Sequence, residues 1–172
     1  MGKAKIIVIC GLPVTGKSTL AESIAKELKF PIFSVDPIES AIIKSGIKRS
    51  FETGLGAYLV VENLAGEQLK LETSVIIDTV SPVKEARDIW NNLSKNFDAD
   101  LFIIECVLEQ SLHKKRVKSR IRNIHGIAEV SWEDVENRRK EYLEWSEKRL
   151  ILDSANPVEE NLQKSLDYIF EK

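Results

Sequence analysis

The sequence contains little of what marks a secreted, membrane-spanning or zinc-binding protein. Only two cysteines occur in 172 residues, and they do not form the closely spaced pairs of a structural zinc site. Both Cys10 and Cys106 lie in apolar runs, where we expect buried, reduced thiols. No apolar run approaches the roughly 20 residues of a transmembrane helix, and the amino terminus lacks an apolar core of signal-peptide length. We therefore expect a cytoplasmic protein.

The sequence also lacks a dominant charge. Its formal net charge is −2, with 30% charged residues, so no overall field attracts nucleic acid or anionic membranes. We expect neither as a partner, and the oligomeric state stays open. A chain of this length can bury one sizeable core and is short for two. We therefore expect a single domain over residues 1–172.

Strand-like and helix-like segments alternate along the whole chain. The apolar runs predict strands over 4–10, 31–36, 74–80, 100–108 and 149–153. Helices are expected over 16–29, 37–45, 54–71, from Ser81-Pro82 onward, and over 110–124, 131–148 and 157–171. This alternation predicts an α/β fold with a parallel sheet covered by helices on both faces. Such sheets bind ligands at the carboxyl ends of their strands, and 110–147 is the expected mobile insert.

The stretch GLPVTGKST, residues 11–19, lies between the first strand and the first helix. Residues 11–18 match the P-loop motif GxxxxGK[ST], whose backbone N–H groups surround phosphates at a helix amino terminus. In this mechanism Lys17 reaches the β- and γ-phosphates of a nucleotide and the Ser18 hydroxyl binds Mg²⁺. The alternative is a glycine-containing turn with an incidental lysine. The predicted nucleotide-binding residues are Gly11, Leu12, Pro13, Val14, Thr15, Gly16, Lys17, Ser18 and Thr19.

Two aspartates end neighbouring apolar strands. Asp78 ends VIID, where a carboxylate can hold Mg²⁺ directly or through water; capping the next helix is the alternative. Asp36 ends IFSVD and precedes Pro37, which suits a helix N-cap. Its functional interpretation is a base, or an acceptor that positions a substrate hydroxyl. Both interpretations of Asp36 stay open.

The stretch LHKKRVKSRIRNI, residues 112–124, is strongly basic. It could be a solvated face, a nucleic-acid contact, or a lid whose arginines neutralise a transferred phosphoryl group. After a P-loop we favour the lid for Arg116 and Arg120. In the following helix, Trp132, Tyr142 and Trp145 are expected to close a small core.

GLPVTGKST, IIDTVSP, ECVLEQSLHKKRVKSR, SWEDV and EWSEKRLILDSA occur together in this order. The set resembles a family of small P-loop ATP-binding proteins, known as AAA-type ATPase domains or predicted kinases. Its relatives include adenylate, gluconate and shikimate kinases, chloramphenicol phosphotransferase and zeta toxin. The resemblance implies a three-layer α/β/α P-loop NTPase fold, a five-stranded parallel sheet in the order 2-3-1-4-5, a helical lid after the fourth strand, and ATP with Mg²⁺.

The resemblance also implies roles for individual residues. It places Lys17 and Ser18 in the phosphate cradle, Asp78 at Mg²⁺, Arg116 and Arg120 in the lid, Asp36 on the substrate side, and Asp153 at the strand end beside the adenine. Two positions depart from the family. Val14 stands where relatives commonly have glycine, and a β-branched residue tolerates unusual φ values poorly. Glu39 replaces an arginine found in several relatives.

These observations predict an ATP-dependent phosphotransferase with an unidentified small hydroxyl or phosphate acceptor. Arg49 and Arg87, near the ends of the second and third strands, are expected anchors for an anionic acceptor, with plain surface charge as the alternative. Two other functions stay open. One is a nucleotide-binding regulatory ATPase or switch without an acceptor. The other is a polynucleotide 5′-hydroxyl kinase that binds a strand through the basic helix.

Overall fold

The computed structural model describes residues 2–120 and 129–170. At its centre five strands form one sheet in the order β2-β3-β1-β4-β5, with every neighbouring pair parallel. The strands are β1 (Lys5–Cys10), β2 (Ile32–Ser34), β3 (Val75–Asp78), β4 (Asp100–Val107) and β5 (Leu150–Asp153). This arrangement confirms the predicted fold class and strand order.

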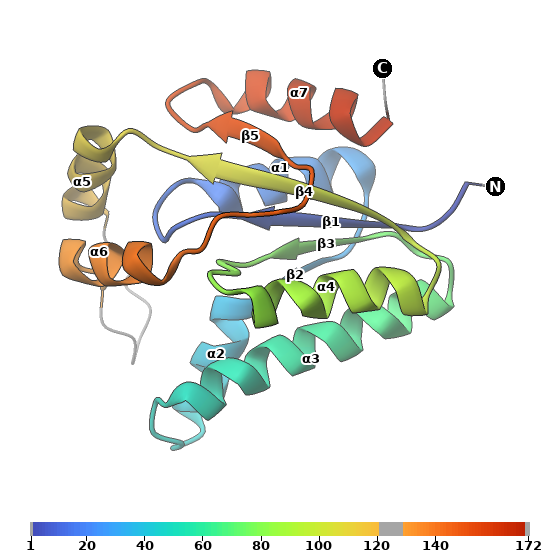
Figure 1. Cartoon of the computed structure of the whole chain (residues 1–172), viewed down its shortest axis with the longest axis horizontal. Coiled ribbons are helices and arrows are strands. Elements are labelled where there is room, and N and C mark those ends of the chain that lie inside the picture. The colour runs from blue at the N-terminus through green and yellow to red at the C-terminus, as the bar shows by residue number, and fades with distance from the viewer. Residues whose placement is uncertain (1, 121–128, 171–172) are drawn as a thin grey trace.

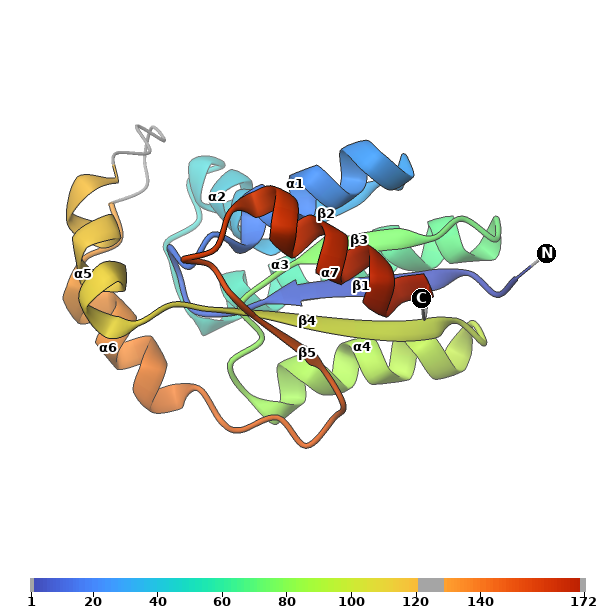
Figure 2. The same ribbon diagram turned by 90° about the horizontal axis from the view of Figure 1, so that it is seen from above.

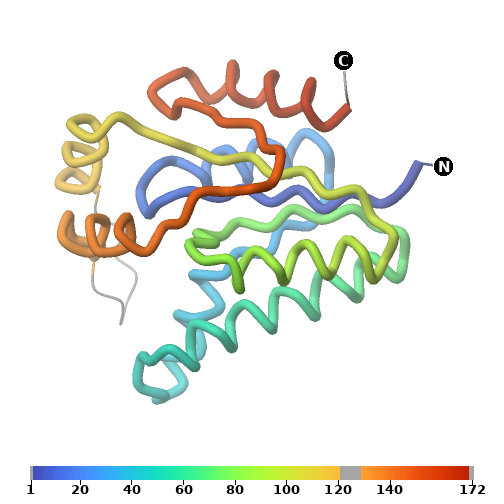
Figure 3. Tube along the Cα trace, viewed as in Figure 1, coloured from blue at the N-terminus to red at the C-terminus, as the bar shows by residue number. Residues whose placement is uncertain are grey.

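Helices cover both faces of the sheet (Figures 1 and 2). α1 (Lys17–Leu28) and α7 (Val158–Phe170) lie on one face, and α3 (Phe51–Lys70) and α4 (Lys84–Asn96) on the other. α2 (Val35–Lys44) packs along α3. α5 (Gln110–Ser119) and α6 (Trp132–Glu141) lie beyond the carboxyl ends of the strands. Figure 3 traces the chain from β4 into α5, and from α6 back into β5.

The core is divided by the alternation of side chains along the strands. In β1, the side chains from Ile6 to Cys10 are all 0% exposed. Ile6, Val8 and Cys10 pack toward α3 and α4, whereas Ile7 and Ile9 pack toward α1 and α7, because successive strand residues face opposite sides. Burial on both faces explains the continuous apolar run. Cys10 and Cys106 are buried free thiols, as expected.

Two element boundaries differ from the prediction. α2 begins at Val35 with Ser34 as its N-cap, so Asp36 lies in the first helical turn and not at a strand end. The N-cap interpretation of Asp36 is therefore wrong. Pro37 does not prevent the early start, because the first-turn N–H groups have no intrahelical partner in any case.

The helix expected over 131–148 ends at Glu141. Trp145 turns into the core, where it is 7% exposed, and the carbonyls of Leu143 and Glu144 bond to Arg87, so the segment cannot continue as a helix. The last residues of the expected insert thus belong to the core. α5 ends at Ser119, and positions 121–124 of the expected basic helix lie outside the described residues.

Within residues 2–120 and 129–170, no helix combines the length and the hydrophobicity that crossing a bilayer requires.

Candidate active site

The P-loop adopts a conformation that depends on two glycines. Gly11 has φ 139°, and a Cβ at this position would lie 2.4 Å from the Cys106 carbonyl oxygen, so no other residue fits against β4. Gly16 has φ 99° directly before α1. Between them Val14 has φ 66°, which is a strained conformation for a β-branched residue. Valine in place of the family's glycine therefore does impose an unfavourable backbone conformation, as the sequence predicted.

The loop presents backbone donors without partners. The N–H groups of Val14, Gly16, Lys17 and Ser18 donate to none of the residues that the structure describes. Thr15 is different, because its N–H and its hydroxyl both donate to the Leu12 carbonyl. Free amides that converge at the start of a helix form an anion-binding hollow.

Lys17 is 3% exposed, and its ammonium makes no hydrogen bond or ion pair with any described residue. An ammonium that lines a cavity without a partner among the described residues favours an anionic ligand. Such a group needs an anion, and the adjacent amides favour the same kind of ligand. The Lys17 ammonium and the free backbone N–H groups of the loop are therefore both suited to bind the same negatively charged group.

Asp78 lies at the end of β3, next to the P-loop, and is 6% exposed. Its Oδ2 accepts a bond from the Ser34 hydroxyl at 3.3 Å, whereas its buried Oδ1 has no partner among the described residues. Burial raises the pKa of the Asp78 carboxyl above its ordinary value, while the Lys17 ammonium and the Ser18 hydroxyl act in the opposite direction. An orphaned carboxylate oxygen near a serine hydroxyl fits a Mg²⁺ site, since this ion prefers oxygen ligands.

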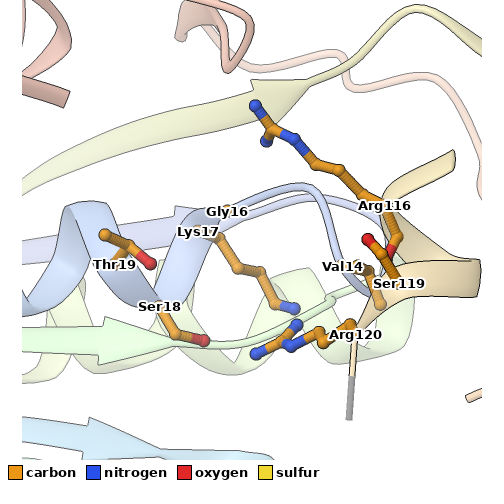
Figure 4. Close-up of a pocket in the computed structure, with 8 residues that line it drawn as sticks. All are labelled: Val14, Gly16, Lys17, Ser18, Thr19, Arg116, Ser119 and Arg120. Atoms are coloured by element: carbon orange, nitrogen blue, oxygen red, sulfur yellow. The ribbon is translucent and has the colours of Figure 1, made fainter. Parts of the chain in front are cut away.

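A cavity of about 280 Å³ opens beside the loop. Its walls are P-loop residues on one side and Arg116, Ser119 and Arg120 on the other (Figure 4). The Arg120 guanidinium points toward Lys17, whereas the Arg116 side chain extends away from it. Arg116 donates at 2.7 Å to the carbonyl of Ser154, in the turn after β5. The structure thus brings both predicted lid arginines to the cavity, in different orientations.

Asp36 and Asp153 lie at the same edge of the sheet. Asp36 is exposed and close enough to Asp78 for its charge to contribute to the raised pKa of that carboxyl, although burial is the main cause. The Asp153 carboxylate accepts the Ala155 N–H at 2.8 Å and so shapes the turn that Arg116 contacts. The structure brings both residues near the P-loop without a direct contact to it.

Arg87 does not reach the cavity. It is 3% exposed, and its guanidinium donates to four backbone carbonyls, those of Ser81, Pro82, Leu143 and Glu144. It also lies 4.0 Å from the centroid of the Trp145 ring. These contacts are structural and engage four of the five guanidinium N–H groups. Both the expected substrate anchor and its surface-charge alternative are therefore wrong for Arg87.

Arg49 precedes α3 and is largely exposed, with its Nε 3.5 Å from the Glu39 carboxylate. It also helps to lower the pKa of the Asp134 carboxyl in α6, after the larger effect of Ser131. Arg49 thus lies between α2 and α6, outside the P-loop cavity. Glu39, the second departure from the family, holds it there.

His113 was not predicted to take part in this site. It is 0% exposed, and its Nε2 lies 2.7 Å from the carbonyl oxygen of Pro13 in the P-loop. A sequence signal was available, because His113, Arg116 and Arg120 recur at helical spacing on one face. The lone histidine carried no recognisable motif by itself.

Comparison with known proteins agrees with this geometry. The family model of the AAA domain matches residues 6–144. An adenylyl-sulfate kinase from Thermodesulfovibrio yellowstonii is 30% identical over 183 residues, covering 99% of this chain and 86% of that protein. A bifunctional polynucleotide phosphatase/kinase from Schizosaccharomyces pombe is 31% identical over 70% of this chain, which corresponds to only 25% of that protein. The structure of Mycobacterium tuberculosis APS kinase with AMPPNP and APS superposes with TM-score 0.74 at 16% identity, covering 98% of this chain and 99% of that one.

Proposed function

The chain belongs to the AAA domain family of P-loop kinase-like proteins, and from this membership we propose that it is an ATP-dependent phosphotransferase. It moves the γ-phosphate of ATP to a hydroxyl or phosphate group of a small acceptor. The observation that carries the proposal is the set of unsatisfied groups at one edge of the sheet. Free P-loop amides, a buried Lys17 and the orphaned Asp78 Oδ1 match the charges of a metal–triphosphate complex.

Each group has a distinct task in this proposal. The amides of Val14, Gly16, Lys17 and Ser18, together with the Lys17 ammonium, bind the β- and γ-phosphates. Ser18 and Asp78 would hold Mg²⁺, which when bound neutralises phosphate charge. Ser34 fixes the Asp78 carboxylate by its hydrogen bond to Oδ2, and so would leave Oδ1 available to the ion. The raised pKa of Asp78, caused mainly by burial, falls back when a cation is present.

The arginines of α5 supply the remaining positive charge. Arg120 points toward Lys17 and is suited to stabilise the charge on the transferred phosphoryl group. Arg116 joins α5 to the turn at Ser154 and closes the cavity over Gly16. Asp36 is an exposed carboxylate at this edge and would position the attacking hydroxyl. Catalysis then depends mainly on positioning and charge neutralisation.

A screen of small metabolites with γ-labelled ATP tests this function, with Lys17→Ala as the blank. Adenylyl sulfate is the first compound to include, because a relative that covers 99% of this chain is an adenylyl-sulfate kinase. Sugars and sugar acids follow. Label transfer that Lys17→Ala abolishes supports the proposal. ATP turnover that no acceptor changes favours a regulatory ATPase instead.

A polynucleotide 5′-hydroxyl kinase is the second candidate. It is favoured by the similarity to the polynucleotide phosphatase/kinase and by the exposed lysines of α5. Contacts to a phosphate backbone release counterions, so this function predicts that activity on a 5′-hydroxyl oligonucleotide falls steeply with salt. Activity on a small acceptor would change much less. The same screen at two ionic strengths separates the two functions.

A further inference from the structure

One face of α5 is turned toward the P-loop. His113, Arg116 and Val117 lie on this face at helical spacing, and Arg120 follows at the C-cap. His113 and Val117 are buried, at 0% and 6% exposure, and the two arginines line the cavity. The face that bears the arginines is therefore the same face that packs on the loop. Any shift of this face relative to the loop moves the arginines with it.

The first contact across this interface is a hydrogen bond. The Nε2 of His113 lies 2.7 Å from the Pro13 carbonyl oxygen, and because a carbonyl can only accept, Nε2 carries the proton. The ring edge packs against Trp132 of α6, with centroids 5.5 Å apart. The opposite nitrogen, Nδ1, is buried without a partner among the described residues. The imidazole is thus held in one orientation and one tautomer.

This bond acts on a peptide unit of the phosphate cradle. The Pro13 carbonyl and the Val14 N–H belong to the same planar trans peptide, in which the two groups point in opposite directions. When His113 holds the carbonyl toward α5, the Val14 N–H must point away from α5. Val14 also lines the cavity, and its N–H is one of the unpaired donors of the loop. The histidine therefore sets the direction of one phosphate-binding amide.

The second contact holds Val14 in its strained conformation. Its side chain is 6% exposed and packs with Val117 of α5 and Val135 of α6. A positive φ strains a valine backbone, and such strain persists only where the surroundings enforce it. Here the surroundings are the two helices beyond the strand ends. The backbone conformation of Val14 thus depends on α5 and α6 as well as on β1 and α1, which flank the loop.

We propose that His113 is a positioning residue, which through the Pro13–Val14 peptide fixes the P-loop and the arginine-bearing face of α5 in one mutual arrangement. The inference rests on the proposed phosphotransferase function for its consequence, namely that nucleotide binding and turnover both require the bond. The hydrogen bond from His113 to the Pro13 carbonyl is present in the structure whatever the function is. Together with the Val14 contact, it makes α5 part of the phosphate site even before any nucleotide binds.

Two substitutions at one position test the bond. His113→Phe keeps a ring against Trp132 and removes the donor, whereas His113→Gln places an amide N–H near the position of Nε2. For His113→Phe we expect about tenfold weaker binding of AMPPNP with Mg²⁺ in calorimetry, because an unsatisfied carbonyl and a turned amide are left behind. Turnover of Mg-ATP should fall by at least about tenfold. His113→Gln should recover both to within about threefold of the wild type.

Backbone hydrogen exchange gives a readout that needs neither acceptor nor turnover. In His113→Phe, exchange of the Thr15 amide, the loop N–H that donates to the Leu12 carbonyl, should accelerate by about tenfold or more, while that of the β3 amides stays unchanged. Gln110→Ala, an exposed and uncharged position on the same helix, is the matched control and should behave as the wild type. Failure of the proposed function would appear as absent transfer in the wild type, with the exchange pattern intact.

Two outcomes would overturn the inference. One is wild-type AMPPNP affinity and loop exchange in His113→Phe. The other is an impairment in His113→Gln as large as that in His113→Phe, because the ring shape and not the donor would then matter.

Discussion

Two neighbouring turns at the carboxyl edge of the sheet each bury a cation, Lys17 in the P-loop and Arg87 behind the turn after β3. Both side chains belong to residues that are 3% exposed. Arg87 donates to four carbonyls and stacks on Trp145. Lys17 bonds to none of the described residues, and the amides around it are equally unpaired.

The difference separates a structural charge from a functional one. The turn after β3 is saturated: the hydroxyl of Tyr58 accepts the Ser81 N–H, and Trp90 donates to the Ser81 hydroxyl. The P-loop edge retains unsatisfied donors and the orphaned Asp78 Oδ1. Unsatisfied buried groups destabilise a fold, so their concentration at one edge indicates a ligand that completes them. Four substitutions examine this contrast.

The largest effect is expected for Lys17→Ala. Removal of the ammonium that binds the phosphates should reduce phosphoryl transfer by at least about 10³-fold. The same change should leave the melting temperature unchanged or slightly higher, because the ammonium makes no hydrogen bond or ion pair with a described residue that the fold could lose. Transfer of label from γ-labelled ATP and calorimetric unfolding measure the two properties. A marked loss of stability would place Lys17 in the same class as Arg87.

Arg87→Met should show the opposite pattern. Four carbonyls lose a charged donor, so we expect a loss of about 3 kcal/mol in the free energy of unfolding. For a chain of this size that corresponds to about 6–12 °C in Tm. Urea denaturation provides the measurement, and Arg87→Lys should recover less than half, since an ammonium cannot reproduce the guanidinium fork. Nucleotide affinity of the folded variant should stay within about threefold of the wild type. Weaker ligand binding by Arg87→Met without a loss of stability would instead support a role for Arg87 in the substrate site.

Arg120→Ala tests a charge that acts on the transition state. We expect kcat to fall by about 100-fold, with ATP affinity changed less than about threefold, because the guanidinium neutralises charge that develops during transfer. Steady-state kinetics and AMPPNP binding are the measurements, and Gln110→Ala is the control on the same helix. Unchanged turnover would count against the assignment of this arginine.

Asp78→Asn should change stability by less than Arg87→Met does, and with the opposite sign. Burial raises the pKa of the folded carboxyl, so the unfolded state is the more ionised one in the window above the ordinary aspartate value of 3.8. The free energy of unfolding therefore falls as pH rises through that window, and the whole cost is reached above the raised pKa.

The amide removes this cost. Without nucleotide, Asp78→Asn should raise Tm at pH 7 by about 1–5 °C, and the gain should shrink as pH falls below the raised value. Magnesium dependence of turnover should weaken at the same time. A lower Tm at pH 7 would show that the carboxylate stabilises the fold and is not reserved for a cation.

The parts of the molecule that follow from local pattern could be predicted from the sequence. The P-loop, the apolar strands and the aspartate at the end of β3 have signals within a few residues. Arg87 could not be assigned in this way, because its partners Leu143 and Glu144 lie more than fifty residues away and offer backbone carbonyls, which every residue has. The early end of α6 has the same cause.

Val14 lies between these cases. The sequence identified it as a difficulty, since a valine replaces a glycine where an unusual φ was expected, and the structure gives it φ 66°. The sequence could not show which contacts offset the strain of this backbone conformation. The packing on Val117 and Val135 joins three segments that only the fold brings together, and the bond from His113 to the Pro13 carbonyl belongs to the same class.

The most direct test of the central claim is a calorimetric titration of the wild-type protein with AMPPNP, with and without Mg²⁺. The unsatisfied groups at the P-loop predict uptake of one nucleotide per chain that Mg²⁺ strengthens and that Lys17→Ala abolishes. A wild-type protein that takes up no nucleoside triphosphate in the presence of Mg²⁺ would contradict the account.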